Sequence, residues 1–186
     1  MQSKFKNLST RDICFMAIFA AITAVCAQIS VPGPGGVPFT LQTLAVQLSG
    51  VILGAKRGAA AIVVYVLLGA IGVPVFSNFG GGLGFIAGVS GGFIVSFPIL
   101  AFITGLGNAN IIKLVPAILA GTVVTFAVGL LWAAWLLHGE INFYTLSAAA
   151  MLVVVPFIVP EIIKMVVSGT VGLRIKTALI KAELLG

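Results

Sequence analysis

The chain has 186 residues, of which 60% are hydrophobic and only 8% are charged, and its mean hydropathy is +1.25. Soluble domains carry about 25% charged residues, so this composition excludes a soluble globular domain and indicates an integral membrane protein. The net charge of +6 comes from small basic groups between apolar blocks. That distribution marks membrane topology and argues against nucleic-acid binding.

We expect an all-α fold with six membrane helices in one domain over residues 1–186. A crossing needs about 20 residues, so the length leaves room only for helices and short loops. The first apolar run follows basic residues, but it is too long for a signal peptide and lacks a small-residue cleavage site. Breaks in the pattern place the helices at roughly 13–30, 41–55, 58–73, 91–106, 112–137 and 148–173.

Two segments rich in Gly and Pro interrupt the helices, at 31–38 and 74–92. Both follow odd-numbered crossings, so we expect them on the same side of the membrane. The connections on that side, near 31–40, 74–90 and 138–147, contain no Lys or Arg. The opposite side carries nine basic residues, and positive charge marks the cytoplasmic side. We therefore expect both termini in the cytoplasm; the nine residues are Lys4, Lys6, Arg11, Lys56, Arg57, Lys113, Arg174, Lys176 and Lys181.

The tenth basic residue, Lys164, lies ten residues before Arg174, which is about 15 Å into the membrane along a helix. Glu161 is three residues away, so the two side chains share a helix face. Because a charge at such depth is costly to insert, it faces the protein interior or a cavity. One hypothesis is an ion pair that only fixes helix packing. We favour a pocket that offers a small polar ligand one acceptor and one cation.

Other polar groups accompany the pair. The outward segment 74–92 holds Ser77, Asn78 and Ser90, and the second predicted helix holds Gln42, Thr43 and Gln47, which either line a cavity or pack. Prolines at 156 and 160 free backbone carbonyls near Glu161. The chain has no nucleotide-binding glycine motif, no metal-ligand spacing and no nucleophile–base pair. We therefore expect no bound metal, no cofactor, no enzymatic activity and no internal use of ATP.

Four stretches resemble the BioY family, the biotin-specific substrate-binding component of energy-coupling factor (ECF) vitamin transporters. The resemblance runs across nearly the whole chain, although the family usually has Asp where Glu161 stands and Pro-Thr where Val89 and Ser90 stand. The stretches are VPFTLQTLAVQLSGVILGAKRG (37–58), YVLLGAIGVPVF (65–76), GVSGGFIVSFP (88–98) and PFIVPEIIK (156–164).

This resemblance implies a six-helix bundle of the S-component type in a prokaryotic plasma membrane. It also implies biotin bound near the outer face, on family-like positions Asn78, Glu161 and Lys164. The further candidate contacts are Ser90, Gln47, Phe39 and Phe79.

The resemblance also implies partners: a transmembrane coupling subunit and ATP-binding-cassette ATPases. The family carries an alanine pattern on its first helix where the coupling subunit docks. Ala17 and Ala21 match that pattern, with Ala20 and Ala24 as a second register.

Two alternative functions stay open from the residues themselves. The chain could be a substrate-binding component for another small vitamin, which only the resemblance argues against. It could also be a small oligomeric solute channel, although its polar groups gather in the outer half, which favours a capped binding site.

Overall fold

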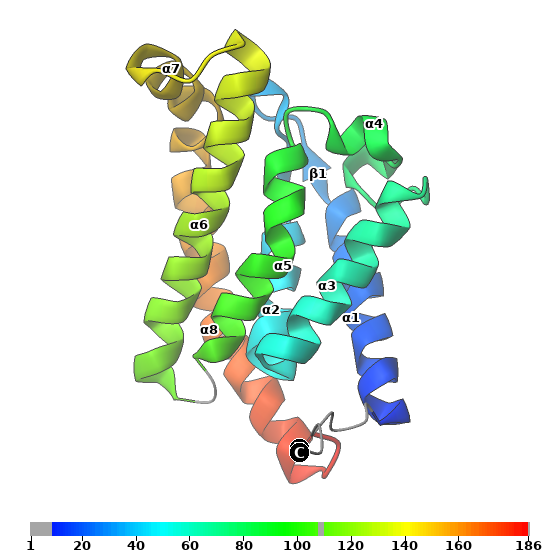
Figure 1. The fold of residues 1–186 in the computed structure, drawn as a ribbon. Coiled ribbons are helices and arrows are strands. Elements are labelled where there is room, and N and C mark those ends of the chain that lie inside the picture. Colours follow the sequence, from blue (N-terminus) through cyan, green and yellow to red (C-terminus); the bar gives the residue numbers. More distant parts are fainter. Residues whose placement is uncertain (1–8, 108–109, 186) are drawn as a thin grey trace, which may run out of the picture.

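The computed structural model describes residues 9–107 and 110–185 and shows a bundle of helices (Figure 1). The basic residues Lys4 and Lys6 of the topology prediction lie outside the described residues. The main helices are α1 (Thr10–Gln28), α2 (Gln42–Leu53), α3 (Ala55–Ala70), α5 (Gly91–Leu106), α6 (Ile111–His138) and α8 (Ile158–Lys181). Shorter elements are β1 (Ser30–Val31), η1 (Pro34–Gly36), β2 (Phe39–Thr40), η2 (Ser77–Phe79), α4 (Leu83–Ile86), α7 (Phe143–Val153) and η3 (Val155–Phe157).

Side-chain caps explain where several helices begin. The Ser9 side chain accepts from the Arg11 amide in a capping box that includes Asp12, at the start of α1. Asn110 caps α6 in a similar way, by accepting from the amide of Ile112 at 2.9 Å. Such caps satisfy the free N–H groups of a first helical turn. They therefore fix helix starts that hydropathy alone locates only roughly.

Within the described residues, three helical stretches are long and apolar enough to cross a membrane: Thr10–Gln28, Ile111–His138 and Phe143–Lys181. Helices α2 and α5 are apolar but shorter. The break between α2 and α3 falls at Gly54, where φ is +81°, a conformation that favours glycine. The predicted helices at 41–55 and 58–73 thus meet at a sharp turn, with little loop between them.

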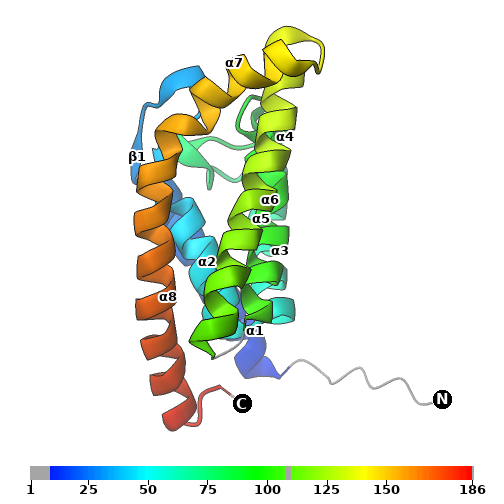
Figure 2. The same ribbon diagram turned by 90° about the vertical axis from the view of Figure 1, so that its left-hand side faces the viewer.

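The last predicted helix, 148–173, differs from the observed structure. It is divided into α7, the short turn η3 and α8, which continues to Lys181. Pro156 lies in η3 and cannot donate a helical hydrogen bond, whereas Pro160 lies in the first turn of α8, where no such bond is required. Helix α7 consequently bends away from α8 and lies across one end of the bundle (Figure 2).

The connections predicted to face one side gather at the same end of the bundle as α7 (Figure 1). The first forms a two-stranded antiparallel hairpin, in which Ser30 pairs with Thr40 and Val31 with Phe39. The second contains η2 and α4. Helix α1 begins, and α8 ends, near the opposite end (Figures 1 and 2).

Small residues allow the central helices to approach closely. A side chain added at Gly50 would lie 2.4 Å from the carbonyl oxygen of Ala101, so α2 and α5 are in backbone contact there. Gly105 makes a similar approach to Ala55 at the start of α3. Glycine permits such close packing within membranes. The helices are in close contact at these glycines, whereas side chains of α2, α5, α6 and α8 line a cavity nearer the hairpin.

Candidate ligand-binding site

A cavity lies among α2, α5, α6 and α8, beneath the hairpin, with an interior volume of about 60 Å³. Its walls are mostly apolar, with a limited set of polar side chains. This composition is typical of sites for small organic molecules. The polar lining residues are Thr40, Gln42, Thr43, Ser77, Ser90, Thr122, Thr125, Glu161 and Lys164.

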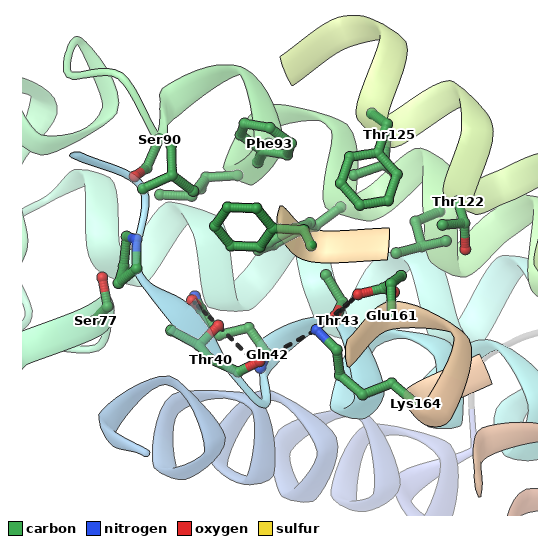
Figure 3. A pocket seen from close by; sticks show the side chains of 17 residues that line it. Thr40, Gln42, Thr43, Ser77, Ser90, Phe93, Thr122, Thr125, Glu161 and Lys164 are labelled. Atoms are coloured by element: carbon green, nitrogen blue, oxygen red, sulfur yellow. Dashed lines mark hydrogen bonds and ion pairs between the residues drawn. The ribbon is translucent and has the colours of Figure 1, made fainter. Parts of the chain in front are cut away.

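The predicted charge pair lies in this cavity (Figure 3). Nζ of Lys164 is 2.6 Å from Oε2 of Glu161, and the two side chains are 11% and 5% exposed. Both come from the first turns of α8, one helical turn apart, so the backbone itself brings them together. The pair is buried, intramolecular and formally neutral.

Further hydrogen bonds compensate the burial of these charges. The Thr43 hydroxyl donates to Oε2 of Glu161 at 2.8 Å. Lys164 donates to the Thr43 hydroxyl at 2.6 Å and to the carbonyl oxygen of Thr40 at 3.3 Å. Together with the ion pair, these contacts engage all three N–H groups of the ammonium. A buried ion pair requires such extra bonds to offset its desolvation.

Gln47 lies behind Glu161 and is absent from the cavity wall. It is fully buried, and its amide donates to Oε1 of Glu161 at 2.8 Å and to the Thr122 hydroxyl at 3.3 Å. Its amide oxygen accepts from the Ser168 hydroxyl at 2.8 Å. The structure therefore places this sequence-predicted contact residue in a supporting position, where it holds the carboxylate.

A second hydrogen-bonded chain leads from the hairpin toward the outer loop. The Thr40 hydroxyl donates to the amide oxygen of Gln42 at 2.9 Å, and the Gln42 amide donates to the buried Tyr65 hydroxyl at 2.6 Å. Tyr65 in turn donates to the carbonyl oxygen of Val75 at 3.1 Å. The orientation of Gln42 in the cavity is thus set by residues of β2, α3 and the 71–76 connection.

The outer loop contributes differently from the prediction. Ser77 and Ser90 line the cavity, at the end away from Thr122 (Figure 3). Asn78 is exposed and does not line it. The backbone turns at Asn78 and Phe79, with φ of +55° and +57°, and the Phe79 amide donates to Gln28 at 2.8 Å. This turn directs both predicted contact residues away from the cavity, and Phe79 is 71% exposed.

Aromatic side chains form much of the apolar wall. Phe93, Phe97, Phe126 and Phe157 line the cavity. Phe39, a predicted contact, does not line it, but its ring stacks on Phe157 with centroids 4.2 Å apart. Sequence reasoning missed the lining residues of α5 and α6, because the charge on these two helices, Lys113, lies in the first turn of α6 and outside the cavity. The available signal was the pair of threonines, Thr122 and Thr125, in an otherwise apolar helix.

The alanine positions on α1 divide between two faces. Ala17 and Ala21 are exposed, whereas Ala20 is 5% exposed and Ala24 packs against the core. The first register therefore faces outward from the bundle, and the second packs inside the chain. No group of three or more potential metal-ligating side chains occurs among the described residues.

Comparison with known proteins adds family membership to this geometry. The family model described as the BioY family matches residues 1–181. The probable biotin transporter BioY of Pyrococcus horikoshii is 40% identical over 169 residues, which cover 91% of this chain and 98% of that one. The biotin transporter BioY of Thermotoga maritima is 37% identical over 171 residues, covering 89% and 96%.

A solved structure shares the fold. It is described as the S-component for biotin from an ECF-type ABC transporter, and it matches with a TM-score of 0.76 and 22% identity over 95% of both chains. At that identity the match establishes the fold. The names of the sequence relatives place them among transporters, in agreement with the expectation of a non-enzymatic membrane protein.

Proposed function

The chain belongs to the BioY family, and we propose that it is the biotin-binding membrane subunit of an ECF-type vitamin uptake transporter. The observation that carries this proposal is the buried Glu161–Lys164 pair in the wall of an aromatic cavity. Biotin combines a polar cyclic urea, an apolar sulfur ring and an aliphatic tail that ends in a carboxylate. A cavity with one cluster of polar groups and otherwise apolar walls suits such a molecule.

The charges of the cavity indicate how the ligand lies. Glu161 is an acceptor, and the only N–H donors of biotin are those of the cyclic urea, so the urea lies beside Glu161. Lys164 holds this carboxylate in place through the ion pair. Because the pair is already neutral, it does not compensate a second carboxylate. The ligand's acidic tail therefore points toward the opposite end, where Ser77 and Ser90 line the cavity.

The hairpin over residues 30–40 acts as a cover in this proposal. Val37, Pro38 and Thr40 line the cavity, and the carbonyl oxygen of Thr40 accepts from Lys164. The cover is thus hydrogen-bonded to the ion-pair partner of Glu161. Asn78 is exposed outside the cavity, so a contact between Asn78 and the ligand requires a different conformation of the η2 turn.

For topology, we propose six crossings, formed by α1, α2, α3, α5, α6 and α8, with both termini in the cytoplasm. The support is the distribution of basic residues in the sequence together with the positive-inside rule. Asp12 of α1 and Arg57 of α3 form an ion pair at 3.2 Å at the end assigned to the cytoplasm. The opposite end of the bundle, with the hairpin and η2, then faces the outside of the cell, from which biotin is taken up.

Uphill uptake needs energy, and this sequence contains no nucleotide-binding motif. We propose that a transmembrane coupling subunit and ATP-binding-cassette ATPases supply it. The exposed Ala17 and Ala21 face of α1 supports this arrangement, because small residues let a partner helix approach closely within the bilayer.

Calorimetric titration of the purified protein with biotin tests the proposed function. We expect saturable binding that Glu161→Gln weakens strongly, since the variant loses the charged acceptor. The matched control is Glu140→Gln, because Glu140 is exposed at the start of the α6–α7 connection and lies outside the cavity. Absence of binding by the unaltered protein, or equal binding by both variants, would contradict the proposal.

A further inference from the structure

The Thr125 hydroxyl is a buried polar group of the cavity that lacks a partner within the protein. Thr125 lies on α6, and its side chain is only 3% exposed. It lines the cavity, on the helix that faces Glu161 and Lys164 (Figure 3). Its Oγ1 has no hydrogen-bond partner among the described residues.

Three other helical threonines of this chain form a local hydrogen bond that Thr125 lacks. Thr23, Thr170 and Thr177 each donate to the carbonyl oxygen four residues earlier, at 2.7, 2.8 and 2.8 Å. This local bond is the usual way in which a threonine satisfies its hydroxyl inside an apolar helix. Thr125 does not form it. Its hydroxyl is therefore available to a group that enters the cavity.

Burial without a partner does not by itself make a site. Thr104 on α5 also has a buried, unpaired hydroxyl, yet Thr104 does not line the cavity. Thr125 combines both properties. An unpaired buried hydroxyl destabilises the empty protein, and a ligand acceptor in the cavity would remove that cost.

We propose that the Thr125 hydroxyl donates a hydrogen bond to the carbonyl oxygen of the cyclic urea; this inference rests on the proposed function. With a urea N–H beside Glu161, the carbonyl oxygen needs a donor from another wall. The three N–H groups of Lys164 already contact Glu161, Thr43 and the Thr40 carbonyl. Thr122, one turn further into the bundle, already shares a hydrogen bond, because its hydroxyl accepts from Gln47. Among the described residues, Thr125 is the lining residue of α6 whose hydroxyl has neither a donor nor an acceptor partner.

Three variants test the inference by calorimetry and thermal unfolding. Thr125→Val replaces the hydroxyl with a methyl group, and we expect it to weaken biotin binding about tenfold, equivalent to about 1.4 kcal/mol. The same variant should be at least as stable as the unaltered protein without ligand, because it removes an unpaired buried hydroxyl. Thr125→Ser keeps the donor and should retain most of the affinity. Thr104→Val is the control and should leave affinity unchanged.

The combination of lower affinity with undiminished stability is the signature of a ligand contact. A merely structural role for Thr125 predicts the reverse, lower stability with unchanged affinity, and that result would overturn the inference. So would equal biotin affinities for Thr125→Val and the unaltered protein. If Thr125→Val does not fold, a large affinity loss in the folded Thr125→Ser variant would also contradict the donor role.

A second ligand locates the contact. Desthiobiotin keeps the cyclic urea but lacks the ring sulfur, so Thr125→Val should weaken its binding by the same factor as that of biotin. A loss restricted to biotin would place the hydroxyl against sulfur and overturn the assignment to the urea. Failure of the unaltered protein to bind either ligand would instead refute the proposed function.

Discussion

The buried side chain of Gln47 donates a hydrogen bond of 2.8 Å to Oε1 of Glu161, the carboxylate oxygen that the Lys164 ion pair does not use. The two oxygens of Glu161 are therefore held from different sides. This arrangement fixes the orientation of an acceptor inside an apolar cavity. A ligand then meets a preorganised group, which reduces the ordering cost of binding.

Gln47→Met is expected to loosen this arrangement while nearly conserving volume. It leaves Oε1 of Glu161 without its buried donor, which costs about 1–3 kcal/mol. We expect a lower melting temperature and weaker biotin binding, measured by thermal unfolding and calorimetry. Ser96→Ala is the control, because the Ser96 hydroxyl is equally buried but bonds only to Phe93 of its own helix. Unaltered stability and affinity in Gln47→Met would contradict the supporting role.

Lys164→Ala should weaken biotin binding by at least about tenfold, or about 1.4 kcal/mol. It leaves the buried Glu161 carboxylate without its cation and without the contact that orients it, which is strongly unfavourable. Calorimetry on protein that purifies folded measures the effect. Lys113→Ala serves as the control, since Lys113 is exposed in the first turn of α6 and does not line the cavity. If Lys164→Ala binds biotin normally, the pair serves only to fix helix packing.

Hydrogen exchange in residues 30–40 should slow when biotin is bound. The hairpin covers the cavity, and its Thr40 carbonyl is bonded to Lys164, so ligand-induced ordering of the site is transmitted to it. Mass spectrometry of exchanged peptides, with and without saturating biotin, reads this out. Peptides from the first turns of α6, at the end of the bundle away from the hairpin (Figure 1), provide the internal reference. The cover proposal fails if protection of the hairpin is the same in both states.

Replacing both Ala17 and Ala21 by Leu should separate binding from transport. Both positions are exposed, so we expect biotin binding by the isolated subunit to survive. Co-purification with the ATPase-containing module, and ATP-dependent uptake, should fall together because bulky side chains block close helix approach. Ala148→Leu, an exposed position on α7, is the matched control. Intact co-purification and uptake in the double variant would show that the coupling subunit docks elsewhere.

The sequence predicted the charged centre of the site because charges are rare in a membrane. Glu161 and Lys164 stood out against an apolar background, and their three-residue spacing placed them on one face. The helix break near Pro156 was foreseeable as a kink. Its extent was not, because a proline shows that a hydrogen bond is missing and leaves open how far the chain turns before the next helix begins.

Other features depend on which helix face points inward. Helices α5 and α6 are predominantly apolar, and such helices give little sequence signal for their inner face. The contributions of Phe93 and Thr125 therefore emerged only from the fold. Ala17 and Ala20 illustrate the same limit, since both fit a four-residue pattern but only Ala17 is exposed. Asn78 illustrates a further limit of prediction from sequence, because a turn with positive φ directs this side chain outward.

Direct titration of the purified subunit with biotin, in the absence of any partner protein, tests the central claim. We expect saturable binding of one biotin per chain with a Kd below about 1 μM, together with no comparable binding of thiamine or riboflavin. We also expect that the subunit, reconstituted alone in liposomes, does not conduct solutes as a channel does. Absence of biotin binding, or equally tight binding of another vitamin, would refute the proposed biotin-binding function.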